Sequence, residues 1–165
     1  MTRTLCGFAA ALVLAGCAAS FGPTALAPGT PREEVLARMG QPGRVVPLPG
    51  GGQRLQYSLQ PAGQYAWMVD VDASGRVVNA RQVLNERDFN RIVPGQWTRA
   101  DIEREFGPPA RVDQVASWNG PVMTYRWKDL QNADMFYWVY LDPQGVVRRA
   151  HPGMEFRDRL FDFRF

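Results

Sequence analysis

The chain has 165 residues, with 19 Lys and Arg, 16 Asp and Glu, one His and two Cys. This length suits one ordinary domain or two very small ones. The formal net charge of +3 is far below what a basic nucleic-acid-binding surface requires, so nucleic acid is not an expected partner.

The N-terminal segment, residues 1–16, predicts a cleavable signal peptide. Arg3 gives it a short cationic start, and an uncharged apolar run follows that is too short to span a bilayer. The run ends in Leu-Ala-Gly-Cys at residues 14–17, which resembles the bacterial lipobox, where a cysteine after small residues is acylated. We therefore expect a lipid on Cys17 and a lipidated tether over residues 17–27. An ordinary secretory peptide with an incidental cysteine is the alternative.

The lipid predicts where the protein resides. Two or three acyl chains anchor a protein firmly, whereas a single chain anchors it only marginally. Residues 18–20 are Ala, Ala and Ser, and none is the Asp that often retains such proteins at the inner membrane of a Gram-negative bacterium. We expect an outer-membrane protein that faces the periplasm. Because Cys6 is discarded with the signal and Cys17 is acylated, no thiol remains for a disulfide, a metal or a nucleophile.

An internal repeat organises the rest of the chain. Residues 32–45 (REEVLARMGQPGRV) are echoed by residues 99–112 (RADIEREFGPPARV) at an offset of 67. A second block recurs at an offset of 70 and pairs Leu55 and Tyr57 with Tyr125 and Trp127, Asp72 with Asp142, Gly75 with Gly145, and Val77 with Val147. We expect a tandem duplication, with repeat 1 over residues 28–84, repeat 2 over 85–150 and a C-terminal tail over 151–165. Small units bury little apolar surface alone, so the two repeats should share an interface.

Each repeat opens with a helix signal. Thr30–Glu33 and Thr98–Asp101 each place a hydroxyl three residues before an acid, which is the spacing of a capping box. Apolar residues follow four apart, hence on one helix face: Val35 with Met39, and Ile102 with Phe106. Gly40 and Gly107 are expected to end the helices. Residues 85–92 predict a brief additional helix in repeat 2.

Alternating apolar residues predict antiparallel strands after each helix. The alternation is clearest at Leu55, Tyr57 and Leu59 and at Tyr65, Trp67, Val69 and Val71. A period of two indicates a sheet with one buried face. Asp72–Gly75 and Asp142–Gly145 predict hairpin turns, from which strands 76–84 and 146–150 return. The predicted fold class is α+β, with two tandem repeats that each pack a short helix or helix pair on a small antiparallel β-sheet.

The sequence offers little chemistry for catalysis. His151, the only histidine, follows the last predicted strand without a serine or cysteine nucleophile pattern, and we interpret it as a surface-loop residue without a role. Asp70 and Asp72 lack the ligand spacing of a calcium loop, and we interpret them as turn-forming and solvated acids. We expect no enzyme activity, no catalytic residue, no metal and no cofactor.

One predicted strand, residues 135–141 (MFYWVYL), is apolar on both faces. Its second face carries Phe136, Trp138 and Tyr140, where repeat 1 has Ala66, Met68 and Asp70. Buried strands of this kind are common, so the face packs against repeat 1 or the tail in one interpretation. In the other interpretation it is a partner-binding surface, because exposed aromatic residues typically anchor protein interfaces.

The repeat unit carries an ordered set of motifs. They are the helix and Gly-Gln-Pro stop of residues 32–45, an aromatic strand, and the Val-Asp-Val-Asp-Ala-Ser-Gly-Arg-Val turn of residues 69–77, with a second copy through residues 94–95 and 107–112. This order resembles the SmpA/OmlA (BamE) family of envelope lipoproteins. The resemblance implies a lipid-anchored accessory subunit of the machinery that inserts β-barrels into the outer membrane. The same unit in tandem is similar to the beta-lactamase inhibitory proteins, and both groups act by binding proteins.

These observations favour a non-enzymatic, lipid-anchored periplasmic lipoprotein that binds envelope proteins, in outer-membrane protein assembly or envelope integrity. The resemblance implies the barrel-assembly machinery as the partner. The alternative is a lipid-anchored inhibitor or adaptor of a periplasmic enzyme. A hydrolase or a small-ligand carrier would instead show a concave pocket with convergent polar groups between the repeats.

Overall fold

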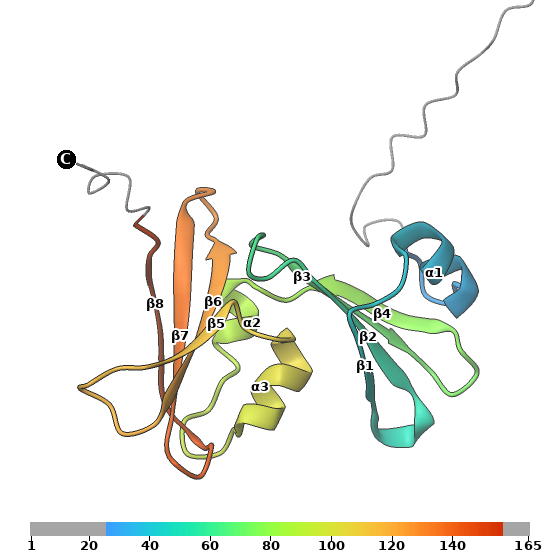
Figure 1. Cartoon of the computed structure of the whole chain (residues 1–165). Coiled ribbons are helices and arrows are strands. Elements are labelled where there is room, and N and C mark those ends of the chain that lie inside the picture. Colours follow the sequence, from blue (N-terminus) through green and yellow to red (C-terminus); the bar gives the residue numbers. More distant parts are fainter. Residues whose placement is uncertain (1–25, 157–165) are drawn as a thin grey trace, which may run out of the picture.

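The computed structural model describes residues 26–156, which form two four-stranded antiparallel sheets with short helices packed on them (Figure 1). The N-terminal elements are α1 (Arg32–Met39), β1 (Arg44–Pro47), the 3-10 turn η2 (Pro49–Gly51), β2 (Gln53–Ser58), β3 (Ala66–Val71) and β4 (Val77–Gln82). The C-terminal elements are α2 (Glu86–Phe89), α3 (Arg99–Phe106), β5 (Arg111–Gln114), β6 (Pro121–Lys128), β7 (Asp134–Leu141) and β8 (Val147–Met154). Both sheets have sequential strand order, so the fold is α+β. The signal peptide, Cys17 and tail residues 157–165 lie outside the described residues.

The two eight-residue helices begin differently, although their sequences align. At α3, the Thr98 hydroxyl accepts a hydrogen bond from the Asp101 N–H at 3.3 Å, and the Asp101 carboxylate accepts one from the Thr98 N–H at 2.8 Å. The predicted capping box is confirmed there. At α1 the N-cap is Pro31, and the Thr30 hydroxyl donates to the Ala27 carbonyl at 2.7 Å instead, so the capping box predicted at Thr30 is wrong. None of the described helices has the length and hydropathy needed to cross a membrane.

Both helices end at a glycine with a positive φ, 77° at Gly40 and 78° at Gly107. Each glycine carbonyl accepts a hydrogen bond from a strand tyrosine, Tyr57 for Gly40 at 3.1 Å and Tyr125 for Gly107 at 2.8 Å. Burial raises the pKa of Tyr125 well above its ordinary value, so its hydroxyl stays a donor. Tyr57 therefore corresponds to Tyr125, and the pairing of Tyr57 with Trp127 inferred from the sequence is wrong by two residues. The two extra residues lengthen the β6–β7 hairpin, because nine residues separate Arg126 from its cross-strand partner Phe136, whereas seven separate Ser58 from Ala66.

α1 covers one face of the N-terminal sheet. The buried apolar side chains between them are Leu26, Val35, Leu55, Tyr57, Val69, Val71 and Val77. Val35, on the apolar face of α1, is fully buried, and the predicted alternation on β2 and β3 supplies the sheet side of this core. Each fully buried Val or Leu contributes roughly 1.5–3 kcal/mol to stability, so this small core holds α1 in place.

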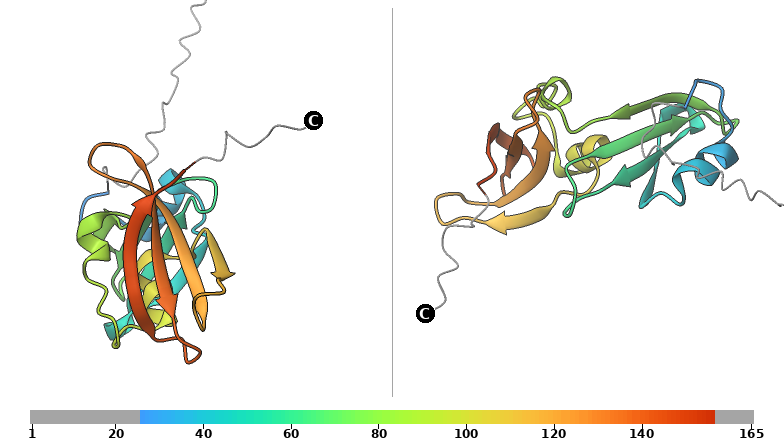
Figure 2. Two further views of the ribbon diagram at one scale, coloured as in Figure 1. Left: turned by 90° about the vertical axis from the view of Figure 1, so that its left-hand side faces the viewer. Right: turned by 90° about the horizontal axis from the view of Figure 1, so that it is seen from above.

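The opposite face of the N-terminal sheet is also buried, so the expectation of one buried face is wrong for this sheet. α3 lies between the two sheets (Figure 2), and the core that α2 and α3 form with the C-terminal sheet extends onto β3. The members of this core are Ala66, Met68, Val83, Leu84, Phe89, Ile92, Ile102, Phe106, Met123, Tyr125, Trp127, Tyr137, Val139, Leu141 and Val147. The expected interface between the two halves is therefore built around α3.

Ion pairs and hydrogen bonds hold the halves together at this interface. Arg54 donates to the Asp70 carboxylate at 2.6 and 2.9 Å and pairs with Glu105 of α3 at 3.0 Å. Gln56 donates to the Arg104 carbonyl at 3.0 Å, near the end of the same helix. Asp70 is only 9% exposed, so its interpretation as a solvated acid is wrong. Polar residues on this face of β2 and β3 serve the interface and not solvent.

The hairpin turns agree with the sequence, whereas the last strand differs. The carboxylates of Asp72 and Asp142 accept backbone hydrogen bonds within their turns, as predicted. β8 continues past Pro152 to Met154. It is an edge strand, so the missing N–H of Pro152 is tolerated where no neighbouring strand needs it as a donor. His151 therefore lies within β8, and its interpretation as a surface-loop residue is wrong.

Candidate functional site

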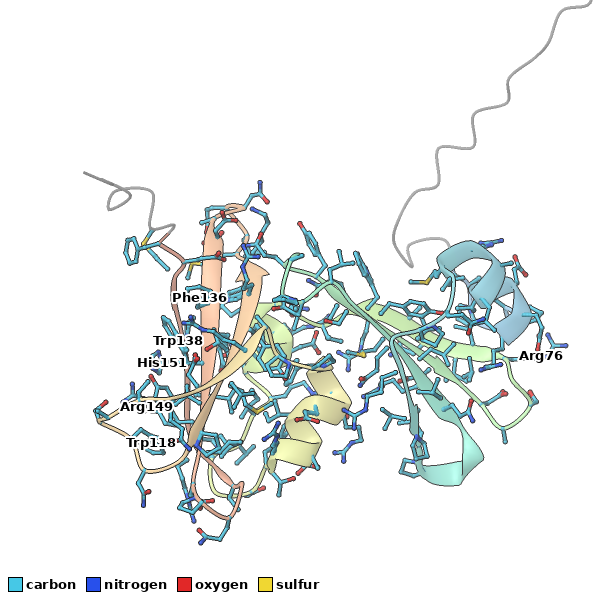
Figure 3. The ribbon with its side chains drawn as sticks, viewed as in Figure 1. Arg76, Trp118, Phe136, Trp138, Arg149 and His151 are labelled. Atoms are coloured by element: carbon cyan, nitrogen blue, oxygen red, sulfur yellow. The ribbon has the colours of Figure 1, made fainter. Side chains whose placement is uncertain are left out.

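The side of the C-terminal sheet that faces away from α3 is lined with aromatic rings. Alternate residues of β7 are buried against the helices, and those between them, Phe136, Trp138 and Tyr140, are partly exposed on the other side. His151 of β8 and Trp118 of the β5–β6 loop lie along this same outer side (Figure 3). We call these five residues the outer aromatic face.

The rings of the outer aromatic face form a continuous row. Trp118 packs edge-on against Tyr140 with 5.3 Å between centroids, and Tyr140 stacks on His151 at 5.5 Å. His151 in turn contacts Trp138 at 5.3 Å, and Trp138 contacts Phe136 at 5.6 Å. These separations fall within the range of about 4.5–7 Å at which aromatic pairs attract. The row therefore offers a large apolar surface whose rings hold fixed positions relative to one another.

Two local features hold the row in place. Gly153 makes room for the Trp138 indole, since a Cβ at Gly153 would lie 2.4 Å from Cζ3 of that ring. The Trp118 indole N–H donates to the Leu141 carbonyl at 2.7 Å, which ties the β5–β6 loop to the end of β7. Side chains that are held before binding lose less conformational entropy when a partner arrives. The outer aromatic face is thus preorganised.

Two arginines border the row. The Arg149 guanidinium lies 4.4 Å from the Tyr140 ring centroid, and one of its nitrogens is 2.8 Å from Nε2 of His151. The Arg111 guanidinium lies 5.7 Å from the Phe136 ring centroid. Both distances allow cation–π attraction, and both arginines are exposed. The surface therefore combines aromatic rings with a positively charged border.

Open hollows also lie on the described part of the C-terminal half. One, of about 640 Å³, runs along the β5–β6 loop and includes Trp118 and Asn119. Another, of about 390 Å³, lies between α2 and the β6–β7 connection and includes Trp127 and Leu130. Across residues 26–156, no group of three or more His, Cys, Asp or Glu side chains is arranged to hold a metal ion. The outer aromatic face, with its row of partly exposed rings, is the candidate functional site.

Sequence reasoning identified Phe136, Trp138 and Tyr140 and missed the other members of the face. The structure directs Phe136 and Trp138 away from the N-terminal sheet (Figure 3), and Tyr140 stacks on His151 of the same outer side, so the interpretation that the three pack against the first half is wrong. Of the predicted tail, His151 and Gly153 do lie against Trp138, whereas residues 157–165 lie outside the described residues. His151 would have been found beside Trp138 if the last strand had been extended, because residues on one strand face alternate. Trp118 lies in a loop, and the sequence holds no pattern that places it.

Comparisons with known proteins identify no family for this chain. No family model matches it, and no curated protein sequence does so either. Among solved structures it is similar to a DUF4309 family protein from Bacillus subtilis, with 14% identity over 76% of this chain and 79% of that one and a TM-score of 0.31. It is also similar to an extracellular protein containing a SCP domain from Bacillus anthracis, with 13% identity over 94% of this chain and 50% of that one and a TM-score of 0.32.

A third similar structure is a cysteine-rich secretory protein from Staphylococcus aureus, with 14% identity over 77% of this chain and 44% of that one and a TM-score of 0.29. The chain matches half or less of the length of these last two proteins. At TM-scores of this size the similarity carries no argument about function. The BamE-like resemblance in the sequence therefore stays a prediction.

Proposed function

We propose that this chain is a non-enzymatic lipoprotein, anchored by a lipid on Cys17 to the outer membrane and facing the periplasm, that binds an envelope protein. The observation that carries the proposal is the outer aromatic face, a held row of partly exposed rings with arginines at its border. Aromatic residues and arginine are the types that dominate protein interfaces and their binding hot spots. We assign the binding to outer-membrane protein assembly or envelope integrity, in line with the BamE-like resemblance.

We further propose that the halves, residues 28–84 and 85–150, are tandem copies of one BamE-like unit. The sequential strand order supports this, as does the tyrosine-to-glycine hydrogen bond found once in each half. A register shift recurs between residues 70 and 71 and between residues 140 and 141. An isolated bridge also recurs at the start of each long helix, as Pro31–Arg76 and Thr98–Val146. This arrangement supports a binding role. The first sheet is covered by α3 of the second unit, whereas among the described residues no further unit covers the outer face of the second sheet.

The lipid anchor has its own test. The Leu-Ala-Gly-Cys motif of residues 14–17 predicts acylation of Cys17, so Cys17→Ser should abolish incorporation of radiolabelled palmitate and release the protein from the membrane fraction. Palmitate labelling of Cys17→Ser at the level of the unmodified chain would contradict the anchor.

The binding role is tested by capture from detergent-solubilised envelopes. Full-length protein, Trp138→Asp and Val78→Asp serve as baits, and each is checked for folding by circular dichroism. Val78 is 53% exposed on β4 of the N-terminal half, so Val78→Asp introduces the same charge away from the outer aromatic face. Arg149→Glu is a second variant of the face that alters an exposed side chain and leaves the rings intact.

We expect the unmodified chain and Val78→Asp to capture the same envelope protein and Trp138→Asp and Arg149→Glu to lose it. Truncating a hot-spot residue costs about 2 kcal/mol or more, which corresponds to a loss of about thirtyfold in affinity. Barrel-assembly subunits among the captured proteins would support the assembly role, whereas a soluble periplasmic enzyme would favour an inhibitor or adaptor. Capture that is equal for all four baits, or absent for all, would refute partner binding by this face.

A further inference from the structure

The N-terminal sheet contains an internal example of what such a sheet face binds. Its face toward the C-terminal half is covered by α3, and polar side chains hold that helix in place. Gln56 donates to the Glu103 carbonyl at 2.9 Å. Arg44 pairs with the Glu103 carboxylate at 3.1 Å, and Arg81 contacts the Glu105 carboxylate at 3.7 Å. The sheet therefore receives a helix whose carboxylates meet basic side chains.

Strand register places the outer aromatic face in the corresponding position on the C-terminal sheet. One row across the N-terminal sheet joins Gln56, Met68 and Arg81, and the matching row joins Thr124, Trp138 and His151. Arg111 begins β5 as Arg44 begins β1. Within the described residues, no helix covers this second face. Its chemistry therefore indicates the kind of helix that it would receive.

We propose that the outer aromatic face docks one amphipathic α-helix of the partner protein, and that this helix carries carboxylates beside its apolar stripe. The inference rests on the proposed function and names the element that is recognised. Trp138 on the second sheet occupies the position of Met68 on the first sheet, where Met68 packs close to Gly107 at the end of α3. Phe136 likewise occupies the position of Ala66. The rings offer more apolar area than the residues they replace. The docked helix should therefore present apolar residues at a spacing of three and four.

The charges of the face favour an acidic helix over a basic one. Arg111 and Arg149 are exposed at its border, and among the described residues the carboxylate paired with Arg111 is that of Asp113, at 2.8 Å. Arg111 also stands where Arg44 meets a glutamate of α3. Glu or Asp on the docked helix would pair with the two arginines, and Lys would be repelled by them.

A second copy of this chain fits the face less well than an acidic partner. The helix that corresponds to α3 is α1, and it has Arg38, paired with Glu34, at the position where α3 has Glu105. Docking α1 of another molecule would bring Arg38 toward the positively charged border of the face. Like charges at an interface select against such a pairing. The occupant is therefore a helix of a different protein.

The test uses the full-length protein in phosphatidylcholine nanodiscs and three synthetic peptides of about five helical turns. The first peptide has a Leu and Phe stripe flanked by Glu, and the second has Lys in place of each Glu. The third is the first peptide with proline substituted in its interior, so that it keeps the Glu residues but cannot form a helix. Binding is followed by tryptophan fluorescence against empty nanodiscs. We expect the Glu peptide to bind about tenfold more tightly than the Lys peptide, and the proline peptide not to bind.

Charge reversal supplies the matched control. R111E/R149E should reverse the preference, so that the Lys peptide binds about tenfold more tightly than the Glu peptide. R76E makes the same kind of change at the far end of the molecule (Figure 3) and should leave the preference unchanged. Equal binding of the Glu and Lys peptides, binding of the proline peptide, or a preference that R111E/R149E does not alter would overturn the inference.

Two other occupants have distinct signatures. Displacement of the Glu peptide by a muropeptide fragment would indicate a glycan site, and concentration-dependent self-association abolished by R149E would indicate a second copy; either result overturns the helix inference. If capture from envelopes depends on Trp138 while the peptides show no charge preference, the proposed function stands and the helix inference fails. If capture does not depend on Trp138, the proposed function fails.

Discussion

Arg54→Met tests whether the ion pairs around α3 hold the two halves together. The Arg54 side chain is 7% exposed and binds the carboxylates of Asp70 and Glu105 together with the Arg104 carbonyl at 3.1 Å. The hydrogen bond to Asp70 raises the pKa of Arg54 and outweighs the opposite effect of desolvation. The Arg54 guanidinium is therefore charged in the folded protein. Removing one partner of a buried ion pair leaves uncompensated charge and costs about 3–5 kcal/mol. We expect Arg54→Met to lower the free energy of unfolding by this amount.

Urea unfolding of the full-length protein, followed by circular dichroism, measures this loss. Arg44→Met is the matched control, because the Arg44 side chain is 50% exposed in its pair with Glu103 and should contribute under about 1 kcal/mol. Arg54→Met/Asp70→Leu should recover part of the loss, since it removes the Asp70 carboxylate that Arg54 paired with, whereas Glu105 keeps its pairs with Arg81 and Arg91. A loss for Arg54→Met no larger than that for Arg44→Met would refute the account of the interface.

Three further predictions concern the outer aromatic face, the helix cap and acid stability. Gly153→Val should turn the Trp138 indole out of the row, with changed tryptophan emission and reduced partner capture at an unchanged far-ultraviolet spectrum; unaltered emission would argue against it. Thr98→Ala should cost about 1 kcal/mol in urea unfolding, whereas Thr30→Ala, which removes no cap, should stay within about 0.5 kcal/mol, and equal losses would contradict this. Hydrogen bonds from Thr98 lower the pKa of Asp101, so its stabilising effect is complete above the ordinary pKa of 3.8 and is lost as the pH falls through the lower folded-state value. Asp101→Asn should flatten the decline of stability as the pH falls below about 4, and an unchanged slope would count against the cap.

Local sequence patterns predicted most of the helices and strands because these elements depend on nearby residues. The hydroxyl-to-acid spacing identified the cap at Thr98, and the glycine stops identified both helix ends. The same spacing failed at Thr30, where Pro31 occupies the N-cap and the hydroxyl bonds backward along the chain. Competition of this kind depends on local backbone geometry that spacing alone does not specify.

Long-range packing explains what the sequence did not predict. Polar Gln56 and Asp70 alternate with apolar residues as in a solvent-facing strand, yet α3 from the other half covers them. On β7 the opposite occurred, since the outer side of an apolar strand stays partly exposed at Trp138. Which of two similar faces receives the helix is decided by how the halves meet, and no local pattern encodes that choice.

The central claim is that the outer aromatic face binds an envelope protein, and site-specific photocrosslinking in intact cells tests it most directly. A photoreactive p-benzoylphenylalanine replaces Trp138 in one variant and Val78, exposed on β4, in another. We predict a discrete crosslinked adduct to one envelope protein from position 138 and none from position 78. No adduct from position 138, or the same adduct from both positions, would contradict the account.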